Sequence, residues 1–87
     1  MDSLIIIAPQ EHYEVNSVSE LAGILSRWFR NAGHIAQEMD SHVNYSDCQS
    51  VDWDGMFYAS QNGSLVTVGY TRGLHCYHRI AQIRMNF

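Results

Sequence analysis

A stripe of apolar side chains with helical spacing constrains the fold more than any other feature of the sequence. Its members stand at offsets of 0, 3, 4, 7, 8 and 11 from the first: Leu21, Ile24, Leu25, Trp28, Phe29 and Ala32. Residues at these offsets lie on one face of an α-helix. The apolar residues between 35 and 39 extend the stripe. We therefore predict one long amphipathic helix that ends near residue 40, with Gly33 as the place where it bends.

The start of this helix is marked by the tetrapeptide Ser17-Val18-Ser19-Glu20. The tetrapeptide has the pattern of a capping box, in which two side chains bond the first free amides of a helix. We expect the Ser17 hydroxyl to accept a hydrogen bond from the amide of Glu20, and the Glu20 carboxylate to accept one from the amide of Ser17. Arg27 and Arg30 lie off the apolar stripe, so both are expected to face solvent.

Two strands are predicted before the helix. The run Ser3–Ala8 is continuously apolar after its first residue, which is typical of a strand buried on both faces. The run ends at Pro9, which has no amide hydrogen to donate to a sheet. Tyr13, Glu14 and Val15 then alternate between apolar and polar, which favours a second short strand.

Three further strands are predicted after the helix. Met56–Ser60 and Ser64–Tyr70 flank Gln61-Asn62-Gly63, and the Asn-Gly pair suits a tight β-hairpin turn. Leu74–Phe87 is predicted as the last strand. Its second half alternates clearly, with apolar residues at Ala81, Ile83, Met85 and Phe87 and polar residues between them.

These elements predict a single α+β domain that spans residues 1–87. A chain of 87 residues has room for one domain only. The expected architecture is a two-layer sandwich, in which the long helix covers one face of a small antiparallel sheet. We expect the apolar run at residues 3–8 in the sheet interior, and the second face of the sheet open to solvent or to a partner.

The charged residues argue against direct binding of nucleic acid. All five basic residues are arginines, and nine carboxylates bring the formal net charge to −4. Nucleic-acid binding requires a dense positive surface that displaces counterions from phosphates. The longest apolar run, Leu4–Ala8, is far shorter than the roughly 20 residues of a membrane span, and no basic segment typical of a signal peptide precedes it. We therefore expect a cytoplasmic protein that binds neither nucleic acid nor membrane.

The cysteines and histidines are the main candidates for chemistry. Cys48, Cys76, His78 and His42 nominally supply a set of zinc ligands. The spacing differs from that of structural zinc sites, because Cys48 has no second cysteine or histidine within five residues. On a strand, His75 also points away from Cys76 and His78. No glycine-rich oxyanion loop accompanies either thiol. We expect no metal, no cofactor and no enzymatic activity.

The best candidate for a binding surface is the segment of residues 40–55, which has four aspartates and no arginine or lysine. The predicted protein-binding residues are Asp40, Tyr45, Asp47, Asp52, Trp53 and Asp54. Tyrosine and tryptophan are common anchors of protein interfaces, and carboxylates steer association toward a basic partner. In the alternative interpretation, Trp53 covers an edge of the core and the aspartates are solvated turn formers.

The chain resembles the small acidic inhibitors of phages and mobile elements, anti-CRISPR proteins among them. The resemblance rests on its length, its composition, the order of strand, helix and three-stranded meander, and the acidic segment at 40–55. The resemblance implies a viral, non-enzymatic module that acts in the host cytoplasm. Its partner would be a host protein or nucleoprotein defence complex, and it would occlude a basic, nucleic-acid-binding surface of that complex.

Two alternative functions remain open from the sequence. One is a small metal- or thiol-dependent protein that uses Cys48, Cys76, His75 and His78. The other is a subunit of a larger assembly, such as a homodimer that pairs through an unprotected last strand.

Overall fold

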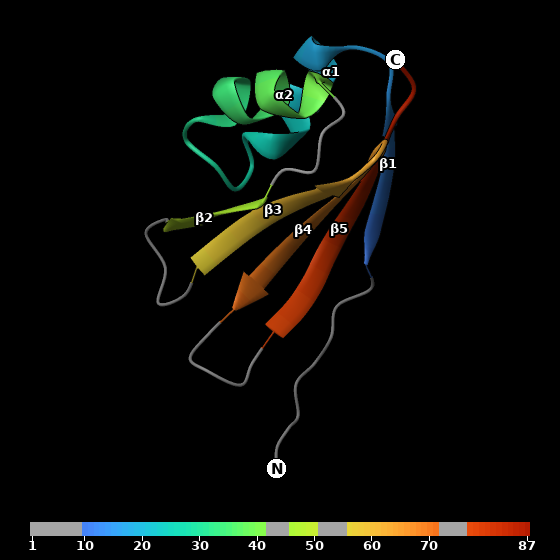
Figure 1. Ribbon diagram of the computed structural model, residues 1–87. Helices are drawn as coiled ribbons and strands as arrows, with labels where there is room; N and C mark the ends of the chain where they lie inside the picture. The colour runs from blue at the N-terminus through green and yellow to red at the C-terminus, as the bar shows by residue number, and fades with distance from the viewer. Residues whose placement is uncertain (1–9, 42–45, 51–55, 72–76) are drawn as a thin grey trace.

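The computed structural model describes residues 10–41, 46–50, 56–71 and 77–87, and in these ranges two helices cover one face of a five-stranded sheet (Figure 1). The elements follow one another as β1 (Glu11–Val15), α1 (Val18–Leu25), α2 (Ala32–Asp40), β2 (Ser46–Ser50), β3 (Met56–Asn62), β4 (Leu65–Thr71) and β5 (Tyr77–Met85). The predicted α+β class and the arrangement of helix on sheet are confirmed. The predicted strand at residues 3–8 lies outside the described residues.

The sheet is mixed, and the prediction of an antiparallel sheet is wrong at one edge. The strand order is β1-β5-β4-β3-β2. β2, β3, β4 and β5 pair antiparallel, whereas β1 pairs parallel to β5 with Val15 opposite Met85. Alternation within a strand predicts which face a residue occupies but not the direction of the neighbouring strand. The pairing of the second predicted strand with the last one is therefore not encoded in the local pattern.

The last strand is central in the sheet, not at its edge. β5 pairs with β4 on one side and with β1 on the other. From Ala81 to Met85 its backbone is therefore paired on both sides, so this part of the strand offers no free edge of the kind that the homodimer alternative would use. The two edges of the described sheet are β1 and β2.

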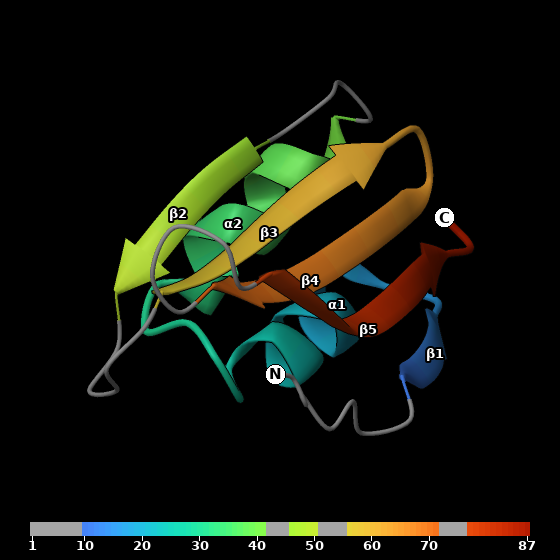
Figure 2. The same ribbon diagram turned by 90° about the horizontal axis from the view of Figure 1, so that it is seen from below.

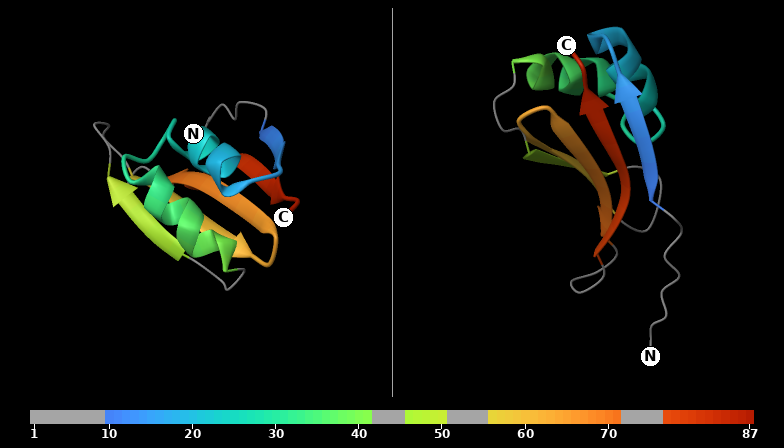
Figure 3. Two further views of the ribbon diagram at one scale, coloured as in Figure 1. Left: turned by 90° about the horizontal axis from the view of Figure 1, so that it is seen from above. Right: turned by 90° about the vertical axis from the view of Figure 1, so that its right-hand side faces the viewer.

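The helical layer consists of two helices, so the prediction of one long helix bent at Gly33 is also wrong. α1 ends at Leu25, and the chain turns through residues 26–31 before α2 begins at Ala32. A straight helix from residue 18 to residue 40 would measure about 34 Å, whereas seven-residue strands such as β3 and β4 span about 23 Å. The turn divides the apolar stripe into two segments that both fit over the sheet (Figure 3).

The capping box at the start of α1 is confirmed with one difference. The Ser17 hydroxyl accepts a hydrogen bond from the Glu20 amide at 3.1 Å. The Glu20 carboxylate reaches back to the amide of Asn16 at 2.7 Å, one residue before the predicted donor. Two of the amides that precede or open the helix are thereby satisfied by side chains.

The core lies between the helices and the inner face of the sheet. Most members of the predicted helical stripe are buried, whereas Ile24 and Trp28 are half-buried and pack against the core. The buried apolar side chains are Val15, Leu21, Leu25, Phe29, Ala32, Ile35, Ala36, Met39, Phe57, Ala59, Val66, Val68, Ala81, Ile83 and Met85. The alternation predicted for the last strand is confirmed, because Ala81, Ile83 and Met85 are all in this set.

The buried polar residue Gln61 joins the sheet to the end of α2. Its side-chain amide donates hydrogen bonds to the carbonyl oxygens of Met39 at 2.7 Å and Gly63 at 2.8 Å. The Met39 carbonyl is one of the last in α2, where backbone acceptors lack partners within the helix. Gln61 is 5% exposed, and among the described residues its Oε1 atom has no hydrogen-bond partner. The side chain therefore ties β3 to α2 through its amide group alone.

The predicted β-hairpin is confirmed, with a shorter turn than predicted. Asn62 pairs with Leu65, so the turn consists of Gly63 and Ser64 instead of Gln61, Asn62 and Gly63. Gly63 has φ +63°, a left-handed conformation that glycine adopts without a steric penalty.

Candidate functional site

The predicted protein-binding residues are only partly within the described ranges. Asp40 is the last residue of α2 and is exposed. Asp47 belongs to β2, where it pairs with Ala59 of β3. Tyr45, Asp52, Trp53 and Asp54 lie outside the described residues. Residues 46–50 form an edge strand of the described sheet.

Asp40 and Asp47 lie close to one end of the helical layer. Gln61 contacts the Met39 carbonyl in the last turn of α2, and the residue two positions before Gln61 pairs with Asp47. Two residues along a strand and one strand spacing separate the backbones of Gln61 and Asp47 by about 8 Å. The end of α2 and the edge strand β2 therefore bring the backbones of Asp40 and Asp47 into one region.

Glu38, which the sequence prediction missed, adds a second exposed carboxylate beside Asp40 at the end of α2. It lies two residues before Asp40 in the last turn of α2, and both side chains are exposed. The last turn of α2 contains no basic residue. We call Glu38, Asp40 and Asp47 the acidic edge. The sequence does contain a signal for Glu38. Residues 31–71 have five carboxylates and no arginine or lysine, so the acidic stretch begins before residue 40.

Glu38 and Asp40 of the acidic edge have an unfavourable position in α2. The carboxyl-terminal end of an α-helix carries a partial negative charge, so carboxylates there reduce stability and basic residues would increase it. Local features that reduce stability are often found at functional sites, because selection for binding outweighs selection for stability there. Glu38 and Asp40 are such a feature.

Four of the five arginines lie within the described ranges. Arg27 and Arg30 are in the turn that precedes α2, and Arg79 and Arg84 are on β5. β5 is separated from the edge strand β2 by two other strands. Viewed from above the helices, α2 lies over the β2–β3 side of the sheet and α1 lies over the side of β5 and β1 (Figure 3). Arg79 and Arg84 therefore belong to the side of the sheet that α1 covers, whereas Glu38 and Asp40 belong to the helix that covers the β2–β3 side.

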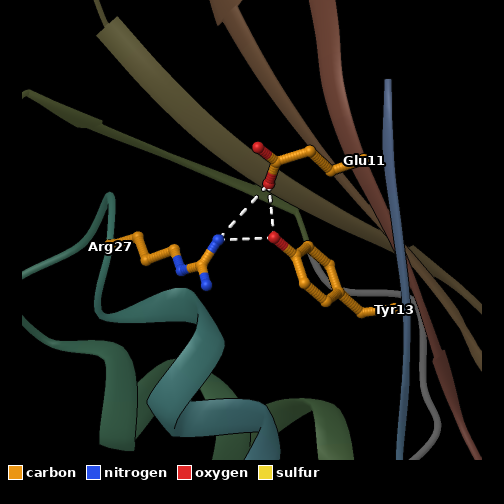
Figure 4. A network of polar contacts seen from close by, with 3 residues as sticks. All are labelled: Glu11, Tyr13 and Arg27. Carbon is orange, nitrogen blue, oxygen red and sulfur yellow. Dashed lines mark hydrogen bonds and ion pairs between the residues drawn. The ribbon is translucent and has the colours of Figure 1, made fainter. Parts of the chain in front are cut away.

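A polar network connects β1 to the turn between the helices (Figure 4). The Tyr13 hydroxyl donates a hydrogen bond to Glu11 Oε1 at 2.5 Å and accepts one from the Arg27 guanidinium. Arg27 also forms an ion pair with Glu11 at 3.4 Å and lies 5.2 Å from the centre of the Tyr13 ring. These three side chains hold the edge strand β1 to the helical layer. Arg27, predicted to be solvated, is half-exposed and paired.

The pKa of Tyr13 follows from these contacts. The hydrogen bond that its hydroxyl donates to Glu11 raises its pKa above the usual value of 10.0, and burial adds to the rise. The positive charge of Arg27 opposes the shift without cancelling it. Tyr13 therefore remains protonated throughout the physiological range, which suits a structural hydrogen-bond donor better than a proton-transfer group.

The cysteine and histidine candidates do not come together in the described part of the chain. Cys48 pairs with Tyr58 in the β2–β3 ladder, and His78 pairs with Tyr70 in the β4–β5 ladder. Three strand spacings separate β2 from β5, which corresponds to about 14 Å. In the described ranges no three histidine, cysteine, aspartate or glutamate side chains form a group that fits a metal ion. His42, His75 and Cys76 lie outside those ranges.

The sheet face opposite the helices carries a shallow groove of about 320 Å³. Figure 2 shows this face, with the strands in front and both helices behind them. The groove lies over β1, β5 and β4, and its walls are formed by His12, Tyr13, Glu14, Leu65, Gln82 and Arg84. The alternation of β5 predicts the outward position of Gln82 and Arg84. The position of His12 and Glu14 beside them depends on the parallel pairing of β1, which the sequence does not reveal.

Comparisons with known proteins give this chain no relative. No protein-family model matches it, and no curated protein or solved structure matches it. Neither helix in the described ranges is long and apolar enough to cross a membrane. Any functional assignment therefore has to rest on the residues described above.

Proposed function

We propose that the protein is a non-enzymatic protein-binding module that presents its acidic edge to a basic surface on a partner. The observation that carries the proposal is the pair of exposed carboxylates, Glu38 and Asp40, at the negatively charged end of α2. They weaken the helix locally, and no basic side chain in the last turn compensates for them. A partner that supplies the missing positive charge would remove this unfavourable interaction on binding.

The edge strand β2 gives this partner a second means of attachment. β2 is the last strand of the sheet on the acidic side, and it pairs only with β3 among the described strands. The outer side of an edge strand presents unpaired amides and carbonyls, which can bond the backbone of another chain. Carboxylates give such a contact its specificity and its association rate, because they attract basic surfaces and repel acidic ones.

The partner class favoured by this chemistry is a protein or nucleoprotein complex with a basic, nucleic-acid-binding surface. An acidic module that occupies such a surface excludes the phosphate backbone that would otherwise bind there. This mechanism is the one implied by the resemblance to small phage inhibitors. It requires no catalytic group, only charge and shape on the acidic edge.

The test is affinity capture from an extract of the native host with the immobilised protein and with matched charge variants. The triple variant E38Q/D40N/D47N keeps side-chain size and removes the charge of the acidic edge. The control E14Q removes one carboxylate from the opposite edge strand. We expect a captured partner whose amount falls at least tenfold with the triple variant and with added salt, but not with E14Q. Equal capture by the wild-type protein and the triple variant would contradict the proposal.

A further inference from the structure

The groove on the sheet face opposite the helices has a definite chemical pattern across three adjacent strands. Glu14 of β1 is opposite Arg84 of β5, and Arg84 is opposite Leu65 of β4. A negative, a positive and an apolar side chain therefore follow one another in a single row. The row spans two strand spacings, or about 10 Å. His12 and Gln82 form the next row, two residues earlier on their strands.

The two charges of this row do not neutralise each other by direct contact. The Glu14 carboxylate accepts a hydrogen bond from the Asn86 side-chain amide at 3.2 Å, which fixes its position on β1. In the described ranges Arg84 forms no ion pair with Glu14 or with any other carboxylate, and it is exposed. Both charges are therefore available to a ligand that carries the two complementary charges.

We propose that this groove binds a small zwitterion, namely an α-amino acid with an aliphatic side chain. The carboxylate of the ligand would bond the Arg84 guanidinium, which has a planar array of donors suited to carboxylates. Its ammonium group would lie against Glu14, and its aliphatic side chain would cover Leu65. A groove of about 320 Å³ is at the small end of the size range of ligand sites, which fits a single amino acid and not a larger cofactor.

The site is independent of the acidic edge. It lies on the face of the sheet turned away from the helices, and its residues belong to β1, β4 and β5 (Figure 2). The acidic edge lies on α2 and β2. Loss of one binding activity therefore leaves the other intact, and the two proposals can be tested separately.

The experiment is a titration of the isotopically labelled protein with L-leucine, monitored through backbone amide signals by nuclear magnetic resonance. We expect saturable shifts at His12, Leu65, Gln82 and Arg84 at millimolar leucine. Two further probes each lack one charge of leucine: leucine amide has no carboxylate, and 4-methylpentanoate has no ammonium group. Each should bind at least about tenfold more weakly, because each loses a charged hydrogen bond.

Variants assign the effect to the groove. R84Q should abolish the leucine-dependent shifts, and E14Q should weaken leucine binding to the level of 4-methylpentanoate. R79Q removes an exposed arginine from the same strand that does not line the groove, so it should bind leucine like the wild-type protein. The proposal is overturned if 20 mM leucine shifts none of these signals, or if R84Q and R79Q respond equally.

Discussion

Replacement of Gln61 by glutamate is expected to destabilise the protein strongly at neutral pH. The two side chains have almost the same shape, but glutamate lacks the amide donors that bond the carbonyl oxygens of Met39 and Gly63. Loss of two hydrogen bonds costs about 1 kcal/mol each. In addition, an ionised carboxylate would be buried at a position that is 5% exposed, next to two carbonyl oxygens. We expect a total loss of about 4 kcal/mol at pH 7, a large part of the stability of a domain of this size.

The pH dependence of the variant distinguishes this explanation from a simple packing defect. Burial without a positive partner raises the pKa of the new carboxyl above its value of about 4.3 in the unfolded chain. The folded state then binds more protons than the unfolded state above that pH, so stability falls as the pH rises. Between the pKa of the unfolded chain and the raised pKa of the folded state, the free energy of unfolding should fall by about 1.4 kcal/mol per pH unit.

The assay is urea unfolding of the wild-type protein, Q61E and Q61L, at pH 4 and at pH 7. Q61L also removes both donors, but it introduces no charge and removes the unsatisfied Oε1 atom. It should therefore cost less than Q61E at pH 7, and its effect should not depend on pH. The reasoning is refuted if Q61E is as stable as the wild-type protein at pH 7, or if Q61E and Q61L differ by the same amount at both pH values.

Three further predictions concern the network of Figure 4 and the acidic edge. R27M should lower the free energy of unfolding by about 1 kcal/mol, because it removes an exposed ion pair and the contact with the Tyr13 ring. Urea unfolding measures this difference between R27M and the wild-type protein, and 1 M salt should reduce it. In a spectrophotometric titration corrected with Y13F, Tyr13 should ionise above pH 10, and E11Q should lower its pKa, since the hydrogen bond to Glu11 is the main cause of the rise. Because the pKa of Tyr13 is raised, its contribution to stability is present below pH 10 and is lost as the pH rises through the folded-state pKa. E38Q and D40N should each increase the melting temperature, because each removes a carboxylate that interacts unfavourably with the helix dipole. The expected gain in the free energy of unfolding is about 0.3–1 kcal/mol per variant. A melting temperature below that of the wild-type protein would contradict the role assigned to these residues.

Local patterns in the sequence predict the elements whose structure depends on near neighbours. The apolar stripe at residues 21–32 predicts the buried face of the helical layer, and Ser17 and Glu20 predict the start of α1. The alternation around Ile83 predicts which face of β5 is buried. These features depend on residues within a few positions of one another, so they are visible without knowledge of the fold.

The remaining features depend on distant parts of the chain. The end of α1 at Leu25 is marked neither by a proline nor by a glycine in the left-handed conformation, so the local sequence does not predict it. The groove combines His12 with Gln82, which are neighbours only through the parallel pairing of β1 and β5. Gln61 has the polar character of a surface residue, and its burial follows from the position of the Met39 carbonyl. The acidic edge is intermediate: its charge is visible in the sequence, but the position of Glu38 and Asp40 in the last turn of α2 depends on where that helix ends.

The central position of β5 has a consequence for the order of folding. β1 is completed early in synthesis, but its partner in the sheet is β5. The first pair of the register joins Glu11 to Ala81, which lies seventy positions further along the chain. Contacts between such distant residues form slowly, because a long segment must close before any stabilisation is gained. The β3–β4 hairpin, with its two-residue turn, is expected to form first and to offer β5 an edge. β1 would then dock last, and until β5 has been synthesised it is an unpaired strand exposed to aggregation or to a chaperone.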